Sequence, residues 1–333
     1  KKIIISNESK LRIIKKFAFS HTSIKAITFP SKLIDVEEGW CRCTKNLIKF
    51  NVSPENPYFK SYKNEFILGK SNKEQENFDV LVFCPRNVVK LTLPDFVEVI
   101  GPFVFNNSEN IEEIIISNES KLRIIEKCSF YNSKIKSIYF PPHLTEICEK
   151  AFCYCNCLKK IQVDDNSELS IIGKNAFYYT SIESFKVPLN LTIIEESAFD
   201  NCNMLKQVEI PFNSRLQVIE KRAFASTSIE NISTTFNLTK ICEDAFASCG
   251  KLKQITIVNS VNTIKIEKNA FSSGSNKSII FPSTYVEFEN GWLNNSNLKE
   301  IIVNPDNPYF QLYDDKLIIG KSSPEKQIFD VLI

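Results

Sequence analysis

The stretch IEESAFDNCNMLKQVEI (194–210) recurs 47 residues later as ICEDAFASCGKLKQITI (241–257). An aromatic residue, usually preceded by Ala, marks each unit, and from Phe105 to Phe271 these landmarks are alternately 25 and 22 residues apart. Globular packing does not require such regularity, whereas a stack of equal coils does. The landmark residues are Phe19, Trp40, Phe105, Phe130, Phe152, Phe177, Phe199, Phe224, Phe246, Phe271 and Trp292.

The segment after each landmark follows the pattern L-x-x-I-x-I/V, as in Leu205, Val208 and Ile210 after Phe199. Its last three positions alternate between apolar and polar, which indicates a half-buried strand, and β-branched residues favour the same assignment. Amphipathic helices fit poorly, because the helical spacing of about 3.6 residues does not extend beyond one turn in any unit. We therefore predict a leucine-rich-repeat solenoid with one parallel strand in each 22- or 25-residue coil and with the landmark rings stacked inside it.

The full unit, I-x-x-x-A-F-x-x-C-x-x-L-x-x-I-x-I/V, resembles the BspA-like class of leucine-rich repeats, and matching units cover nearly the whole chain. The resemblance implies a concave strand face, with short strands and 3₁₀ turns on the opposite side of each coil. It also implies a surface protein of a bacterium or protist of mucosal tissue, of the adhesin or antigen type. Such proteins bind host matrix proteins or other microbes.

A second, much longer repeat interrupts the first. The segment NPYFKSYKNEFILGKSNKEQENFDVLV (56–82) recurs from residue 307 as NPYFQLYDDKLIIGKSSPEKQIFDVLI. Two apolar runs around a polar connection predict a β-hairpin, which we call an island. Similar N-P-x-F inserts occur in BspA-like proteins; a binding role and a spacer role both remain open.

The expected organisation is a single solenoid over residues 1–333. Repeats occupy 1–52 and 86–303, a hairpin island occupies 53–85, and a second, truncated island occupies 304–333. Both ends of the sequence fall inside repeated units, so we expect the chain to be a fragment of a longer array.

Composition argues against most enzyme classes. Eight glycines are present, and the closest two, at 274 and 291, are 17 residues apart. A phosphate-binding loop needs several glycines within one turn, and His21 and His143 are too far apart for a zinc-hydrolase helix. The formal net charge of +2 argues against a nucleic-acid partner, and no apolar run approaches the ~18–20 residues of a membrane span. We expect no enzymatic activity and no cofactor.

The repeat register accounts for five of the eleven cysteines. Cys155, Cys202 and Cys249 each lie three residues after a landmark, where the alternate units carry Ser or Thr. This substitution pattern predicts a small side chain that bonds to the backbone turn of its own or the next coil. Cys148 and Cys242 share another register, and we predict all five to be buried, reduced thiols.

Six cysteines are left: Cys41, Cys43, Cys84, Cys128, Cys153 and Cys157, although Cys43 is itself three residues after Trp40. The dense run from His143 to Cys157 leaves structural zinc and a Cys153–Cys157 disulfide as alternatives. Zinc sites usually use two separated ligand pairs, and a C-x-C-x-C run would splay its sulfurs, so no metal site is predicted. The sequence leaves open the redox state of Cys41, Cys84, Cys128, Cys153 and Cys157.

Nine N-x-[ST] sequons permit secretion without proving it, because the chain is rich in Asn and Ser. These candidate glycosylation sites are Asn7, Asn51, Asn106, Asn118, Asn190, Asn231, Asn237, Asn276 and Asn294.

The outward residues of the strands form the candidate binding surface, because solenoids generally use that face. The register predicts one column of Lys160, Gln207 and Gln254, and a second column of Gln162, Glu209 and Thr256. The alternate coils contribute Tyr139, Lys186 and Ser233. This polar, lightly aromatic face suits a protein or glycan ligand better than a small apolar one.

We therefore predict a non-enzymatic recognition or adhesion protein at the cell surface or outside the cell. The alternative is an intracellular leucine-rich-repeat scaffold that uses the same face, for which free thiols are natural. A His143–Cys148 base and nucleophile is a weaker account than packing, because the equivalent Cys242 has no such His.

Overall fold

The computed structural model describes residues 5–294, 298–313 and 317–333. The chain divides into two compact units, Lys1–Ser167 and Glu168–Ile333. Residues 1–4 of the expected first repeats, 295–297 of the second repeat segment and 314–316 of the second island lie outside the described residues. A single solenoid over the whole chain stays a prediction, and each unit is treated by itself below.

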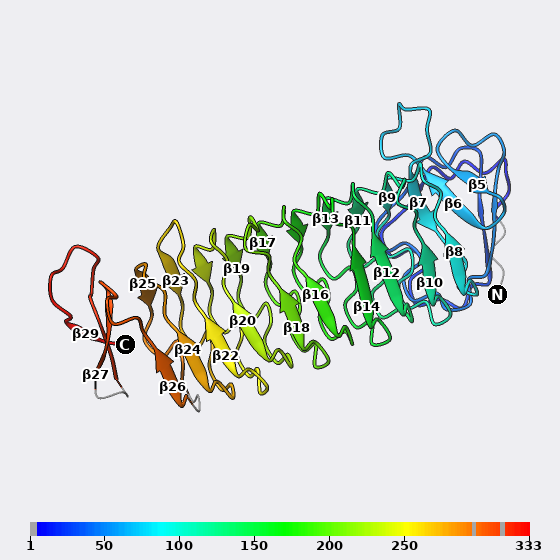
Figure 1. The fold of residues 1–333 in the computed structure, drawn as a ribbon. Coiled ribbons are helices and arrows are strands. Elements are labelled where there is room, and N and C mark those ends of the chain that lie inside the picture. The colour runs from blue at the N-terminus through cyan, green and yellow to red at the C-terminus, as the bar shows by residue number, and fades with distance from the viewer. Residues whose placement is uncertain (1–4, 295–297, 314–316) are drawn as a thin grey trace. The chain divides into compact units, whose positions relative to one another are not determined.

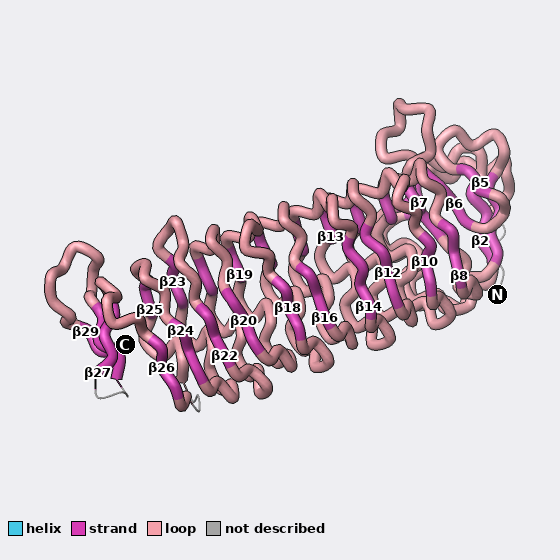
Figure 2. The backbone as a smooth tube through the Cα atoms, viewed as in Figure 1, coloured by secondary structure: helices cyan, strands magenta, loops and turns pink. Residues whose placement is uncertain are grey.

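Both units are built from coils that carry two parallel strands, one before and one after each landmark. We call the strands after the landmarks the front ladder and those before them the back ladder (Figures 1 and 2). The front ladder of the first unit comprises β2 (Ala26–Phe29), β4 (Lys49–Val52), β8 (Lys90–Thr92), β10 (Glu113–Ile115), β12 (Ser137–Phe140) and β14 (Lys160–Val163). Its back ladder comprises β1 (Ile13–Ile14), β3 (Asp35–Val36), β9 (Val99–Ile100), β11 (Ile124–Ile125) and β13 (Glu146–Ile147).

The second unit repeats this arrangement. Its front ladder comprises β16 (Ser184–Lys186), β18 (Gln207–Glu209), β20 (Asn231–Ser233), β22 (Gln254–Thr256), β24 (Ser278–Ile280) and β26 (Glu300–Ile302). Its back ladder comprises β15 (Ile171–Ile172), β17 (Ile193–Ile194), β19 (Val218–Ile219), β21 (Lys240–Ile241), β23 (Ile264–Ile266) and β25 (Val286–Phe288). No helix occurs among the residues that the structure describes.

Alternating burial explains why these residues form strands. In β20 the side chain of Ile232 is buried while Asn231 and Ser233 are exposed, and Ile232 pairs in register with Ile255 of β22. Stacked isoleucines therefore form the inner wall of the coil, and polar columns form the outer one. The predicted leucine-rich-repeat solenoid, with parallel strands and short strands on the other side of each coil, is confirmed.

The landmark phenylalanines stack within each unit. In the first unit the Phe105, Phe130 and Phe152 rings lie 4.8 Å apart in each step and are nearly parallel. In the second unit the stack runs from Phe177 to Phe271 with centroid spacings of 5.1–5.3 Å. All these rings are fully buried, as the sequence predicts.

Each landmark sits in a chain of consecutive tight turns. Around Phe152 the N–H groups of Ala151, Cys153 and Cys155 each donate to the carbonyl three residues earlier, the bond of a 3₁₀ turn. The residues two before and two after a landmark have positive φ, for example Asn175 (56°) and Tyr179 (60°) around Phe177. Such left-handed positions favour Gly, yet this chain fills most of them with Asn, Ser and larger residues.

The hydrogen bonds between coils show that two landmarks, Trp40 and Trp292, were assigned one residue too early in the sequence. In most coils the N–H of the landmark donates to the carbonyl of the residue before the next landmark, as from Phe177 to Ala198 at 2.8 Å. Phe19 makes this bond to Trp40, also at 2.8 Å, and Phe271 makes it to Trp292 at 2.9 Å. Each Trp therefore occupies the Ala position, and the landmark positions belong to Cys41 and Leu293. It follows that Thr44, and not Cys43, lies three residues after the landmark of its coil.

The first island is an antiparallel sheet of β5 (Lys60–Tyr62), β6 (Phe66–Gly69) and β7 (Val80–Phe83). The β6–β7 pairing confirms the predicted hairpin. On its other side β7 pairs in parallel with β9, so that it serves as a back strand of the solenoid. The second island contains β27 (Phe310–Tyr313), β28 (Leu317–Gly320) and β29 (Val331–Leu332), again antiparallel.

The first island has no landmark turn, and a buried arginine supplies the hydrogen bond that such a turn would donate to the next coil. Arg86 donates from Nη1 to the carbonyl of Val104, which precedes landmark Phe105, and to Ser108 Oγ at 3.1 Å. In other coils the carbonyl before the landmark accepts instead from the backbone N–H of the preceding landmark. The Arg86 side chain, 2% exposed, thus continues the ladder across the insertion.

Candidate functional site

The structure places the three predicted binding residues of the first unit on adjacent strands of the front ladder. Tyr139 lies opposite Gln162, and Lys160 lies opposite Ser137. Lys160 and Gln162 are exposed, whereas Tyr139 is half-buried and donates its hydroxyl to Asp164 Oδ2 at 2.7 Å. Burial, together with the bond to Asp164, raises the pKa of Tyr139 to about 12, so the phenol remains a neutral donor.

The second unit holds the other six predicted residues in two columns. Lys186 lies opposite Glu209, and Ser233 lies opposite Thr256. Gln207 lies opposite Ser184, and Gln254 opposite Asn231. All six side chains lie on the outward side of their strands, and Ser184, Asn231, Ser278 and Glu300 share these registers. Columns that run from Lys160 through Gln207 to Gln254, and from Gln162 through Glu209 to Thr256, stay a prediction.

A hollow on this face was not predicted from the sequence. Strands β16 and β18 pair with each other, and β20 pairs with β22, but no pairing joins β18 to β20 among the described residues. A groove of about 690 Å³ opens at this interruption, lined by Glu183, Lys206, Gln207, Glu209 and Glu230 among others. Val208, which is half-buried, lies in the same groove, whereas its counterpart Ile232 is buried.

The groove has charges of both signs. Lys253 donates to Glu230 at 2.6 Å, and this contact lowers the pKa of the Glu230 carboxyl, which remains ionised at neutral pH. Such mixed, hydrated charges suit hydrogen bonding to another polar surface and steer a partner more than they add affinity. A smaller hollow of about 220 Å³ lies in the first unit over β10, β12 and β14, lined by Ile115, Tyr139, Lys160 and Gln162 among others.

Exposed apolar side chains follow the front strands of the second unit. Phe212 follows β18 and Phe236 follows β20, with ring centroids 5.7 Å apart. Phe212 is 73% exposed, and Leu189, after β16, is also exposed. In the sequence, each of these apolar residues stands at the third position after its strand. The strand pattern does not say whether a side chain at that position is buried or exposed, so the exposure was not predicted.

The cysteines behave as packing residues. Cys155, Cys202 and Cys249 are fully buried, and their Sγ atoms donate to the carbonyls of Phe130, Phe177 and Phe224 at 2.9–3.2 Å. In alternate coils Thr22 and Thr227 bond to their own landmark carbonyl. Thr22 and Thr227 confirm the predicted bond to the turn of the residue's own coil, whereas the three thiols bond to the turn of the preceding coil, which the prediction did not include. Burial raises the pKa of Cys155 and Cys202 to about 12 and that of Cys249 to about 11.

None of the eleven cysteines, all of which lie within the described residues, forms a disulfide, and the Cys153–Cys157 alternative is therefore not seen. Cys242 is buried and Cys148 is half-buried, and burial, which is the largest cause, raises the pKa of both. A raised pKa keeps a thiol protonated and poorly nucleophilic. Within the described residues no group of three or more His, Cys, Asp or Glu side chains is arranged to hold a metal ion.

The sequons differ in accessibility. Asn106 and Asn276 are buried, and Asn276 Nδ2 donates to the Phe271 carbonyl at 2.9 Å. Neither amide has room for a glycan in this fold. Asn190 and Asn237 are half-buried, and the exposed sequons are Asn7, Asn51, Asn118, Asn231 and Asn294.

The sequence of the chain matches the family described as the BspA type leucine rich repeat region, in six copies over residues 1–67, 77–206 and 203–313. The chain therefore belongs to the BspA-type leucine-rich-repeat family. A comparison with curated protein sequences gives no match.

Two solved structures are similar in fold. One is a leucine-rich repeat protein from Eubacterium ventriosum, at 20% identity and a TM-score of 0.58, over 71% of this chain and 61% of that one. The other is a leucine-rich repeat protein from Bacteroides ovatus, at 19% identity and a TM-score of 0.51, over 89% of this chain and 67% of that one. The chain thus spans about three fifths of the Eubacterium ventriosum protein. Among its described residues no helix has the length and apolarity to cross a membrane.

Proposed function

We propose that this chain is a non-enzymatic adhesion or recognition module that binds a host or microbial protein or glycan through its front ladder. The observation that carries the proposal is the groove between β18 and β20, where outward polar residues surround a hollow of about 690 Å³. A flat ladder of solvated side chains offers a ligand little shape complementarity, whereas a groove can enclose more of the ligand surface.

The test compares two glutamines of the same unit. Gln207 is exposed in the groove, and Gln217 is exposed just before back strand β19. Wild type, Gln207→Arg and Gln217→Arg are assayed against purified extracellular-matrix proteins and against a glycan array. We expect a ligand whose affinity falls at least about tenfold in Gln207→Arg and is unchanged in Gln217→Arg. Absence of any ligand, or equal binding by both variants, contradicts the front-ladder proposal.

A surface location is part of this proposal and has its own test. Antibody labelling of unpermeabilised cells, together with glycosidase sensitivity of the native protein, separates it from the intracellular scaffold. The lack of disulfides among the eleven cysteines, all within the described residues, favours the scaffold, because oxidising compartments usually form disulfides. An unglycosylated protein that labels only after permeabilisation supports the scaffold and contradicts the adhesin.

A further inference from the structure

The back ladder of the first unit is interrupted at the island, and the interruption leaves one strand edge open. Strand β3 pairs with β1, and β7 is already paired on both sides, with β6 and β9. No strand of the described residues pairs with the second edge of β3. Natural sheets usually cover or protect such an edge, because its backbone groups are a template for another chain.

The register identifies the atoms that are left open. On β1, the carbonyl of Arg12 accepts from Ile34 and Asp35, and that of Ile14 accepts from Glu37. On β7, the carbonyls of Asp79 and Leu81 accept in the same way from the next coil. The equivalent acceptors on β3 are Ile34 and Val36, because Ile13 pairs with Asp35 and Ile14 with Val36. No donor among the described residues bonds to either carbonyl.

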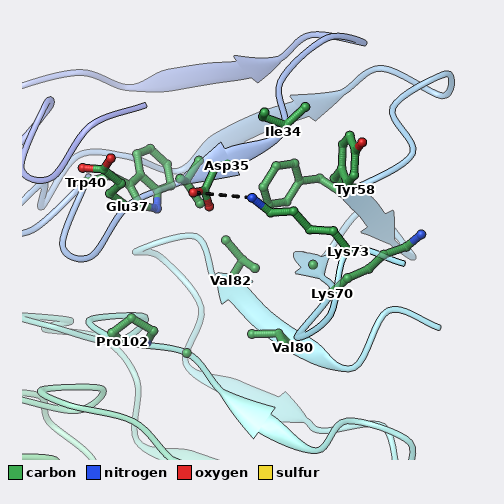
Figure 3. Close-up of a pocket in the computed structure, with 14 residues that line it drawn as sticks. Ile34, Asp35, Glu37, Trp40, Tyr58, Lys70, Lys73, Val80, Val82 and Pro102 are labelled. Carbon is green, nitrogen blue, oxygen red and sulfur yellow. Dashed lines mark ion pairs between the residues drawn. The ribbon is translucent and has the colours of Figure 1, made fainter. Parts of the chain in front are cut away.

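A pocket of about 150 Å³ adjoins this edge (Figure 3). Trp40, Tyr58, Val80, Val82 and Pro102 line it, and Figure 3 shows Val80 and Val82 of β7 on the side opposite β3. An apolar cavity of about 150 Å³ holds a benzene molecule. The pocket is therefore large enough for one branched or aromatic side chain.

Two lysines of the island stand at the rim. Lys73 makes a long contact of 3.7 Å with Asp35, and both side chains are more than 40% exposed, so this pair is weak and easily exchanged. Lys70 Nζ lies 5.0 Å from the Phe78 ring and has no carboxylate partner among the described residues. The rim can therefore take an additional acidic group.

We propose that the open edge of β3 and its pocket bind an extended peptide segment of a partner protein. Backbone N–H groups of the peptide donate to the carbonyls of Ile34 and Val36, which adds a strand to β3. One apolar side chain of the peptide fills the pocket, and an acidic residue pairs with Lys70. This surface is separate from the front ladder, so its occupation does not depend on the function proposed above.

The probe is a phage-displayed library of random dodecapeptides, panned on the whole chain. We expect one enriched family that combines an apolar residue with a neighbouring acidic residue. Synthetic peptides from it bind Val82→Glu and Lys70→Glu at least about tenfold more weakly than wild type, and bind the front-ladder control Lys160→Glu unchanged. Circular dichroism checks each variant, and Lys70→Glu alone decides the matter if Val82→Glu does not fold.

Backbone methylation separates strand addition from side-chain docking. Because the open carbonyls are two residues apart, N-methylation of alternate peptide amides weakens binding at least about tenfold, and methylation of the intervening amides changes it little. The proposal is overturned if no family is enriched or if Lys70→Glu binds the peptides as well as wild type. Equal tolerance of every N-methyl group overturns it as well.

Discussion

Asn56 and Asn307 open the two islands with three equivalent hydrogen bonds, although 251 residues separate them in the sequence. Asn56 Nδ2 donates to the Pro30 and Leu33 carbonyls at 2.6 and 2.9 Å, and its Oδ1 accepts from the N–H groups of Tyr58 and Phe59, both at 2.8 Å. Asn307 bonds in the same way to Pro282, Tyr309 and Phe310. A buried amide that both donates to the previous coil and accepts from its own turn fixes where each island leaves the solenoid.

Replacement of Asn56 by Ala is expected to destabilise the first island. The change leaves two carbonyls and two N–H groups without their partner in a buried place, at a cost of about 2–3 kcal/mol. Urea unfolding followed by Trp40 fluorescence and circular dichroism measures it, since Trp40 lies in the core cluster of the island. Asn51→Ala, at an exposed position of β4, is the control and is expected to stay within ~0.5 kcal/mol of wild type.

Phe199 and Phe212 of the second unit allow the stability contributions of a buried ring and an exposed ring to be compared. Phe199 is fully buried between Phe177 and Phe224, and Phe199→Ala is expected to cost about 3–5 kcal/mol through lost contacts and a cavity. Phe212→Ala, at a 73% exposed ring, is expected to change the free energy of unfolding by less than ~0.5 kcal/mol. Denaturant melts of both variants compare the two costs directly. Equal losses would contradict the assignment of the Phe stack as the core.

The buried thiols predict a pH dependence at the alkaline end. Burial raises the pKa of Cys155 and Cys202 from an ordinary value of 9.0 to about 12, and that of Cys249 to about 11. Between pH 9 and about 11–12 the unfolded chain loses these protons while the folded chain keeps them. Stability is therefore fully present below pH 9 and falls as the pH rises through this range.

Thermal melts at pH 7 to 11 measure this loss. The triple variant Cys155→Ser/Cys202→Ser/Cys249→Ser keeps a donor at each position and has no thiol to ionise there, so its melting temperature is expected to fall less steeply above pH 9. Parallel curves for the variant and the wild type would show that other groups cause the alkaline loss.

Local sequence patterns were sufficient for the coil itself. The alternation of Asn231, Ile232 and Ser233 predicted which side chain faces the core, and the exchange of Cys202 for Thr180 in the preceding coil predicted a bond to the turn. Both signals come from residues close in sequence, and repetition at fixed spacing strengthens them. The face of each candidate binding residue could be assigned in the same way.

Relationships between coils were harder to predict. Trp40 resembles a landmark in the sequence, and only its carbonyl, which accepts from Phe19, reveals that it occupies the Ala position. The groove beside β18 and the open edge of β3 depend on which strands pair across an interruption. In the sequence Val36 stands at the position that Ile14 holds on β1, as an apolar residue does in the other back strands, so this position does not reveal that the edge of β3 is open.

The bonds between landmarks give the repeat a direction. Phe199 donates to the carbonyl of Ala223, and Phe224 donates to that of Ala245, so at the landmark turns the N–H groups point toward the next coil. In the back ladder they point toward the previous coil, as from Cys148 to the Ile125 carbonyl, so the two sides of a coil carry different sets of donors and acceptors, as those of a subunit in a polar filament do. Two stretches of such repeats can be joined end to end in one sense only, and an engineered graft or a natural recombination that keeps the 47-residue pair intact preserves that polarity.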